Sequence, residues 1–238
     1  MADKETSKGG QPIYRHNQAP EGWTAPAYGE EGQEETISNH IAKYFGEPDK
    51  VLHEILSDLV HIDVHIIKPT KERNYYTLFT TGMSYLPMTA PDGYEQYAYA
   101  ELMTHLPPDW NLESQDEKDY WPIRWLKFLA RFPHQYKTWL FYGHTIPNGE
   151  NAEPFDESIG LGCMIIGDTR MLDETDEVDE FVEIKFNDKK IYCLTMLPIY
   201  KEEMELKLNT NANELFKKLS AAGIDDVINP TRKNVCAE

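Results

Sequence analysis

Cysteine is scarce in this sequence, with 3 residues in a chain of 238. Cys163, Cys193 and Cys236 are widely spaced and form no C-x-x-C pair, which excludes a disulfide framework and a structural zinc knot. Cys163 and Cys193 lie inside apolar runs, so we expect both to be small buried hydrophobic residues.

Long hydrophobic runs are also missing. No apolar stretch approaches the roughly 20 residues that span a bilayer. The first residues are polar where a signal peptide would be apolar. We therefore expect a cytoplasmic protein that does not bind membranes. Hydrophobic residues make up 40% of the chain and aromatic residues 12%, which is enough for a substantial core and excludes disorder throughout.

Positively charged residues are few. The chain has 23 Lys and Arg against 41 Asp and Glu, which gives a net charge of −18. Such a charge opposes nonspecific binding to nucleic acid or to an anionic membrane. It favours a protein partner with a basic surface, or a basic segment of a protein. An acidic surface that serves only solubility is the alternative.

Catalytic motifs are absent as well. The chain has no G-x-S-x-G nucleophile elbow and no Walker-type phosphate loop. Gly160, Gly162 and Gly167 resemble a dinucleotide fingerprint only superficially, because the third glycine is misplaced. We therefore expect no cofactor and no enzymatic activity.

The pattern of apolar residues predicts an α+β fold with a mostly antiparallel sheet and helices packed against it. Residues 1–33 are rich in Gly, Pro and Glu and are predicted to form an extended arm, followed by one domain over residues 34–238. Helices are predicted at 34–45, 116–132, 134–142, 202–208 and 212–222. Strands are predicted at 51–56, 61–67, 74–81, 96–106, 159–166, 180–186 and 190–197.

His61, Asp63 and His65 form the sharpest chemical pattern in the chain. Alternation along a strand would place them on one face, and imidazole and carboxylate groups are metal ligands. A metal-dependent hydrolase built on them, with His105 or His144 as further ligands, is the alternative function. The two histidines of an extended strand would stand roughly 13 Å apart, so one shared metal needs a bend. A solvated strand face is the simpler interpretation.

Five residues are candidates for contact with a protein partner. Tyr85 and Tyr94 belong to a tyrosine-rich region, and tyrosine is enriched at interfaces. Glu101 is the charged residue of an apolar strand, and it either points outward or accepts a bond from an arginine or a backbone amide. His144 and Asn148 stand in a long polar loop with the turn dipeptide Asn-Gly.

An ordered set of motifs resembles the suppressor-of-fused (SUFU) domain family, in its short bacterial branch, from about residue 38 to residue 232. These motifs are FTTGMS (79–84), YAELM (99–103), LP (106–107), YWPI (120–123), LKFLARFP (126–133), His134, TW (138–139), GHTIPNG (143–149), LPIY (197–200) and EEME (202–205).

The resemblance implies a non-catalytic binding protein with an α+β fold. The animal member of the family restrains a transcription factor by gripping an extended peptide. Bacterial members include immunity proteins that neutralise toxins. This chain is too short for the full second lobe of the animal protein, so the peptide groove does not carry over residue by residue. The oligomeric state is not predicted.

Overall fold

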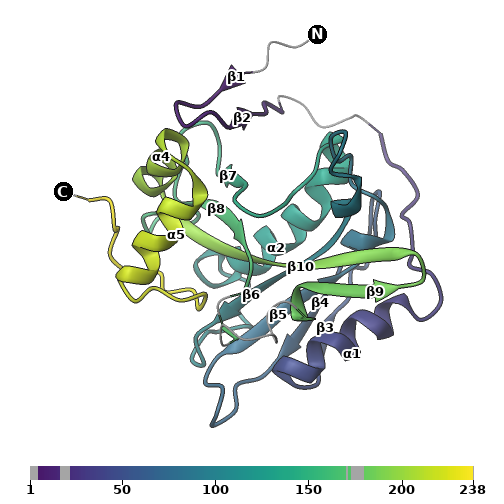
Figure 1. Cartoon of the computed structure of the whole chain (residues 1–238). Coiled ribbons are helices and arrows are strands. Elements are labelled where there is room, and N and C mark those ends of the chain that lie inside the picture. The colour runs from purple at the N-terminus through teal and green to yellow at the C-terminus, as the bar shows by residue number, and fades with distance from the viewer. Residues whose placement is uncertain (1–4, 17–21, 170, 173–179, 238) are drawn as a thin grey trace.

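The computed structural model describes residues 5–16, 22–169, 171–172 and 180–237. A twisted sheet forms the middle of three layers, with α2 on one face and α1, α4 and α5 on the other (Figure 1). The helices are α1 (Gln33–Phe45), α2 (Glu117–Tyr136), α4 (Lys201–Asn209) and α5 (Ala212–Ala221), with the short 3-10 turns η1 (Met83–Tyr85) and η2 (Glu95–Tyr97).

The strands of the main sheet follow the order β3-β4-β5-β6-β10-β8-β7, and β9 pairs with the first part of β10. They are β3 (Lys50–Leu52), β4 (Asp63–Ile67), β5 (Tyr76–Thr81), β6 (Tyr99–Leu106), β7 (Thr145–Pro147), β8 (Leu161–Gly167), β9 (Glu183–Phe186) and β10 (Lys189–Tyr200). The predicted α+β class with a mostly antiparallel sheet is confirmed. Among the described strands of this sheet, β6 and β10 alone run parallel, with Leu102 opposite Leu194. Parallel strands need a long crossover connection, and the segment between β6 and β10, which contains α2, provides it.

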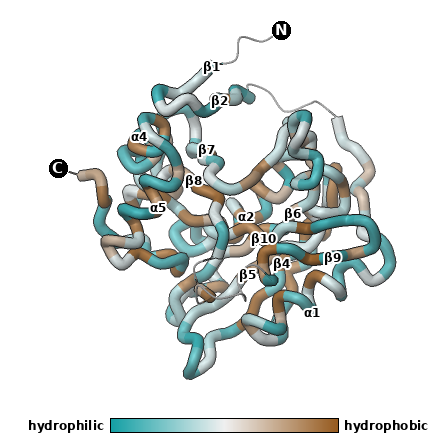
Figure 2. The backbone as a smooth tube through the Cα atoms, viewed as in Figure 1, coloured by the Kyte–Doolittle hydropathy of each residue, from teal (hydrophilic) through white to brown (hydrophobic). Residues whose placement is uncertain are grey.

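Alternation along the strands divides the core between the two faces of the sheet. On β5, Leu78 packs into the cluster beneath α2, and its neighbour Phe79 packs into the cluster beneath α1. The apolar colour of Figure 2 accordingly follows the central strands. Trp121, Trp125 and Leu129 lie on the buried face of α2, as the sequence predicts.

The prediction that Pro133 ends one helix and opens another at 134–142 is wrong. Helix α2 continues through Pro133 to Tyr136, so the packing of the helix against the core outweighs the disruption that an interior proline causes. Lys137, at a φ of 50°, ends the helix in the left-handed conformation. Residues 138–142 form no helix.

Several predicted strands are also too long at one end. Strand β3 stops at Leu52, so residues 53–56 belong to a loop instead. Residues 180–182 are helical, and β9 starts only at Glu183. The predicted polar loop after Gly143 contains the short strand β7.

The described part of the N-terminal arm lies against the domain. Its hairpin of β1 (Glu5–Thr6) and β2 (Pro12–Ile13) docks beside α4, where the Gly9 N–H donates to the Leu208 carbonyl at 2.9 Å. Further along, the Ala27 N–H donates to the Leu59 carbonyl at 2.8 Å. Residues 17–21 of the arm lie outside the described part of the chain. The division of the chain at residue 33 remains a prediction.

Cys163 and Cys193 are buried in the core, as predicted, and all three cysteines carry free thiols. Within the described residues, no helix combines the length and the apolar character that crossing a bilayer requires.

Candidate functional site

Four large apolar side chains are exposed in one region, where the arm meets the loop between β3 and β4. Trp23 and Tyr28 of the arm are 72% and 69% exposed, and Ile55 and Leu56 of the loop are 95% and 90% exposed. We call these four residues the exposed apolar group. The two segments are tied together, because the Trp23 indole N–H donates to the Ser57 carbonyl at 3.0 Å.

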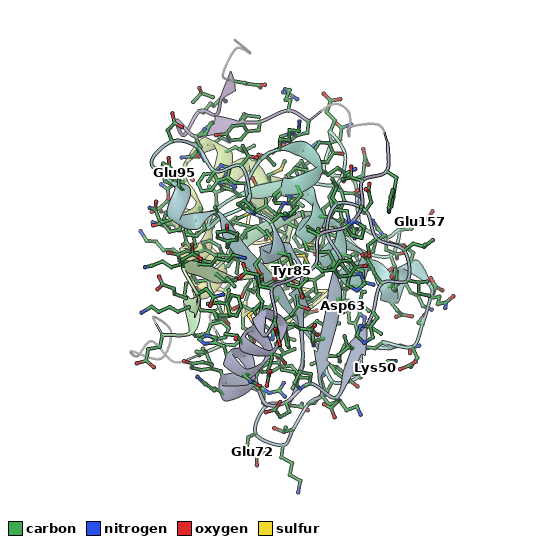
Figure 3. The ribbon with its side chains drawn as sticks, turned by 90° about the vertical axis from the view of Figure 1, so that its right-hand side faces the viewer. Lys50, Asp63, Glu72, Tyr85, Glu95 and Glu157 are labelled. Carbon is green, nitrogen blue, oxygen red and sulfur yellow. The ribbon has the colours of Figure 1, made fainter. Side chains whose placement is uncertain are left out.

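Beside this group, His53, His61 and Asp63 bring their ligand atoms within 4.8 Å of one another. The two carboxylate oxygens of Asp63 lie 2.8 Å from His53 Nδ1 and 3.2 Å from His61 Nε2. Asp63 is buried, and in the view of Figure 3 it lies between the labelled Tyr85 and Lys50. Tyr28 stacks on the His61 ring with 5.3 Å between ring centroids.

A charged network under the loop holds His61 in place. Arg131 of α2 donates from Nη2 to both carboxylate oxygens of Glu54, at 2.7 and 2.6 Å. The Ser57 hydroxyl donates to Glu54 at 2.9 Å and lies 2.8 Å from His61 Nδ1. These contacts connect the β3–β4 loop to helix α2.

Ser57, His61 and Asp63 have the order of contacts of a hydrolytic triad, but the serine is not set up as a nucleophile. A triad histidine must accept the hydroxyl proton of the serine. The Ser57 hydroxyl has one hydrogen and directs it to Glu54, which also forms an ion pair with Arg131. The arrangement therefore does not match the chemistry of an activated serine.

The predicted metal set of His61, Asp63 and His65 is not assembled, because His65 lies elsewhere. Its Nε2 contacts the Thr81 hydroxyl at 2.9 Å, and its ring stacks on Phe79 with 4.6 Å between centroids. Burial lowers the pKa of His65 to about 4. The expected solvated face is also wrong, since every residue of β4 is buried.

His105 and His144, the proposed further ligands, belong to other parts of the core. His105 is fully buried against Thr77, and His144 packs edge-on against Trp139. Alternation of residues could not reveal His53, which joins the group because the β3–β4 connection folds back over Asp63. A histidine ten residues before an aspartate carries no periodic signal.

Glu101 points inward rather than outward, and it accepts four hydrogen bonds. Two come from the Ser84 N–H and hydroxyl at 3.0 and 2.6 Å, one from the Gly82 N–H at 3.0 Å and one from the Thr80 hydroxyl at 2.6 Å. Burial raises the pKa of Glu101 to about 7, although these donors favour the charged form. Bonds from backbone amides were one of the two expectations for this residue. Through these hydrogen bonds, Glu101 stabilises the turn after β5.

The structure brings two other candidates close together. Tyr94, which is partly exposed, packs against Trp139 with 5.3 Å between centroids, and Trp139 packs against His144 at 4.8 Å. Burial lowers the pKa of His144 to about 4. Tyr94, Trp139 and His144 therefore form one aromatic cluster.

Tyr85 and Asn148 are separate from that cluster. The Tyr85 ring lies against the backbone at Gly29 of the arm, and burial raises the pKa of its hydroxyl. The Asn148 amide donates to the carbonyls of Glu153 and Pro154 at 2.9 and 3.0 Å, which shapes the loop around it.

Several solved structures share this fold. A SUFU homolog from Neisseria gonorrhoeae is 18% identical with a TM-score of 0.59, and the match covers 86% of this chain and 97% of that one. A structure of the Sufu-Fu complex is 15% identical with a TM-score of 0.60, and the match covers 89% and 93%.

Drosophila Suppressor of Fused is 14% identical with a TM-score of 0.60 over 88% of this chain, which spans about half, 52%, of the fly protein. At these identities the likeness shows the fold. A search of curated proteins finds no match. The family model "Suppressor of fused protein (SUFU)" matches residues 58–233, most of the chain. The chain therefore belongs to the suppressor-of-fused protein family.

Proposed function

We propose that this chain is a non-catalytic, cytoplasmic protein-binding module that captures a basic protein or a basic segment of one. Membership of the SUFU family supports binding rather than catalysis. A similar fold occurs in a structure of a Sufu-Fu complex, which supports a protein as the partner.

The exposed apolar group is the observation that carries this proposal. Large apolar side chains that gather on a surface mark interaction sites, and aromatic anchors supply much of the binding energy at interfaces. Trp23, Tyr28, Ile55 and Leu56 meet that description, and Trp23 and Tyr28 are held in place by contacts with Ser57 and His61. The cluster of Tyr94, Trp139 and His144 is a second proposed contact region.

Charge selects the kind of partner. At −18, the chain attracts a basic protein and repels an acidic one before contact is made. Attraction of this kind raises the association rate and weakens as salt screens it. A basic partner is therefore the occupant we propose for the exposed apolar group.

The finer proposal is that the chain is an immunity protein and its partner a basic toxin. Co-expression tests it directly, because an immunity protein relieves the growth arrest caused by its toxin. Toxins encoded beside the gene are the first to try. Continued growth arrest with every such toxin, despite good expression of this chain, would rule out the immunity function while leaving the binding function open.

Native mass spectrometry of the tagged protein, purified gently from its own host, tests the binding function itself. A stoichiometric basic protein partner supports the proposal. Its association rate should then fall as the salt concentration rises. A chain that stays alone, or a partner whose association rate ignores ionic strength, would contradict it.

A further inference from the structure

We propose that His53, His61 and Asp63 form a binding site for a divalent transition-metal ion of the zinc type. The three side chains offer two imidazole nitrogens and a carboxylate oxygen, all within 4.8 Å of one another. Zinc accepts this donor set readily, whereas Mg²⁺ and Ca²⁺ prefer oxygen ligands throughout.

The distances in the group are close to those of ligands that share one ion. Ligand atoms bound tetrahedrally at about 2.0–2.1 Å from zinc lie roughly 3.3 Å from each other. His61 Nε2 and an oxygen of Asp63 are 3.2 Å apart, and His53 Nδ1 is 2.8 Å from the other oxygen. The two histidines contact different oxygens of Asp63, so the exposed His53 side chain has to shift for all three groups to bind one ion.

Hydrogen bonds on the far side of His61 direct a lone pair into the site. The Ser57 hydroxyl gives its single hydrogen to Glu54, so its oxygen must accept the hydrogen on His61 Nδ1. In a neutral ring that carries this hydrogen, Nε2 has a free lone pair. Such a lone pair would face a carboxylate oxygen 3.2 Å away, and a metal ion bound between the two atoms would bridge them.

The Glu54–Ser57–His61 chain is the arrangement that metal sites use to fix a histidine ligand. A hydrogen-bonded partner on the second ring nitrogen sets the tautomer and the ring orientation. Asp63 is oriented as well, because one of its oxygens accepts from the Glu54 N–H at 3.1 Å. Two of the three ligands are thus held ready in the protein.

The third ligand leaves the site open toward solvent. The His53 side chain is 67% exposed, so an ion bound here has access from bulk solution and keeps a fourth position for water or another ligand. By linking His53 to His61 and Asp63, the metal would also close the loop that carries Ile55 and Leu56. Metal binding is thus expected to stiffen that loop with or without a protein partner.

Competition between the purified full chain and a chromophoric zinc chelator tests the proposal. We expect one equivalent of Zn²⁺ per chain and a rise in melting temperature when zinc is added. His53→Ala should weaken zinc affinity by about 100-fold or more. Ser57→Ala should weaken it by about 10- to 100-fold, the usual loss when the partner of a metal-bound histidine is removed. Because both residues lie in a surface loop, the variants should fold.

His16→Ala removes a histidine elsewhere and serves as the matched control, with affinity equal to that of the unaltered chain. The competing arrangement is a positively charged His61 that simply donates to Asp63, and it predicts no measurable zinc binding. That result would overturn the proposal. So would zinc binding that His53→Ala leaves unchanged, because the ion would then be held at another place.

Discussion

The guanidinium of Arg232 donates to both carboxylate oxygens of Glu203, at 2.7 and 2.6 Å, and both side chains are buried. Arg232 lies near the C-terminus, and Glu203 is in the first turn of α4. The same carboxylate accepts from the Val235 N–H at 2.9 Å. This ion pair fastens the segment around Arg232 to α4, and Arg232 also donates to the Pro198 carbonyl of β10 at 3.1 Å.

Removal of the Arg232 side chain should be strongly destabilising. Arg232→Met leaves a buried carboxylate without its cation, which costs about 3–5 kcal/mol in the free energy of unfolding. Urea denaturation followed by circular dichroism measures this. Lys217→Met, which breaks the exposed pair with Glu214, is the control and should change stability by less than about 1 kcal/mol. Equal effects of the two changes would show that the buried pair has no special role.

Glu101→Gln should destabilise the turn after β5. An amide in place of the carboxylate presents N–H groups to hydroxyl and backbone donors that already point at this position. Above the raised pKa of Glu101, where its carboxylate is charged, we expect a loss of about 1.5–3 kcal/mol, as for hydrogen bonds to a charged group. Glu113→Gln, on the exposed residue that pairs with Lys50, controls for the chemical change and should be close to neutral. An unaltered unfolding midpoint in the Glu101 variant would refute the structural role.

Gly82→Ala should be more damaging than the same change at Gly93. Both glycines have positive φ, 122° and 87°, so alanine is strained at either position. At Gly82 the new Cβ would also lie 2.0 Å from the His61 carbonyl oxygen, whereas at Gly93 it meets nothing within 4 Å. Backbone strain alone costs about 1–3 kcal/mol, and the clash adds to it. Thermal melting of the two variants side by side compares them, and equal losses would contradict the predicted close approach.

Acid should destabilise the protein through its buried histidines. Burial lowers the pKa of His65 to about 4 and that of His105 to about 3, from an ordinary value of 6.5. Below pH 6.5 the unfolded chain binds protons at these rings and the folded chain does not, so stability falls as the pH drops toward 4. Glu101 acts in the opposite sense between pH 4.5 and 7, because its raised pKa keeps its proton in the folded state.

The variant His105→Leu removes one of these titratable rings, so its contribution to the pH dependence can be measured. Each ring that takes up a proton only on unfolding contributes a slope of about 1.4 kcal/mol per pH unit. Denaturation of this variant between pH 6 and 4 should therefore show a slope that is shallower by that amount. An identical slope would mean that His105 is also protonated in the folded chain.

Substitution of Ile55 and Leu56 by serine should weaken partner binding and leave stability nearly unchanged. Both side chains are almost fully exposed, so the free energy of unfolding should change by no more than about 0.5 kcal/mol. If they anchor the partner, affinity should fall by tenfold or more, since an anchoring residue contributes more than about 1 kcal/mol. Tyr14→Ser, at an exposed aromatic residue of the arm, is the control for replacing an exposed apolar side chain by a polar one. Unchanged affinity in the loop variant would move the binding face elsewhere.

Much of the fold could be predicted from local patterns. The four-residue spacing of Ile37, Ile41 and Phe45 predicts helix α1, and all three are buried in its core cluster. The polar and apolar composition likewise predicts the α+β class, and the ordered motifs identify the family. Local patterns work here because the hydrophobic effect acts on residues whose spacing matches the period of a helix or a strand.

Tertiary structure decided the chemistry of individual side chains. His53, distant in sequence, joins Asp63, while His65, two residues from Asp63, turns to Thr81. Glu101 turns inward because the turn at Gly82 and Ser84 supplies donors for it. The direction of β10 beside β6 and the buried state of β4 likewise depend on layers contributed by distant segments. The reason is physical: a strand's alternation says which side chains share a face, but burial and hydrogen-bond partners come from whatever the rest of the chain packs against that face.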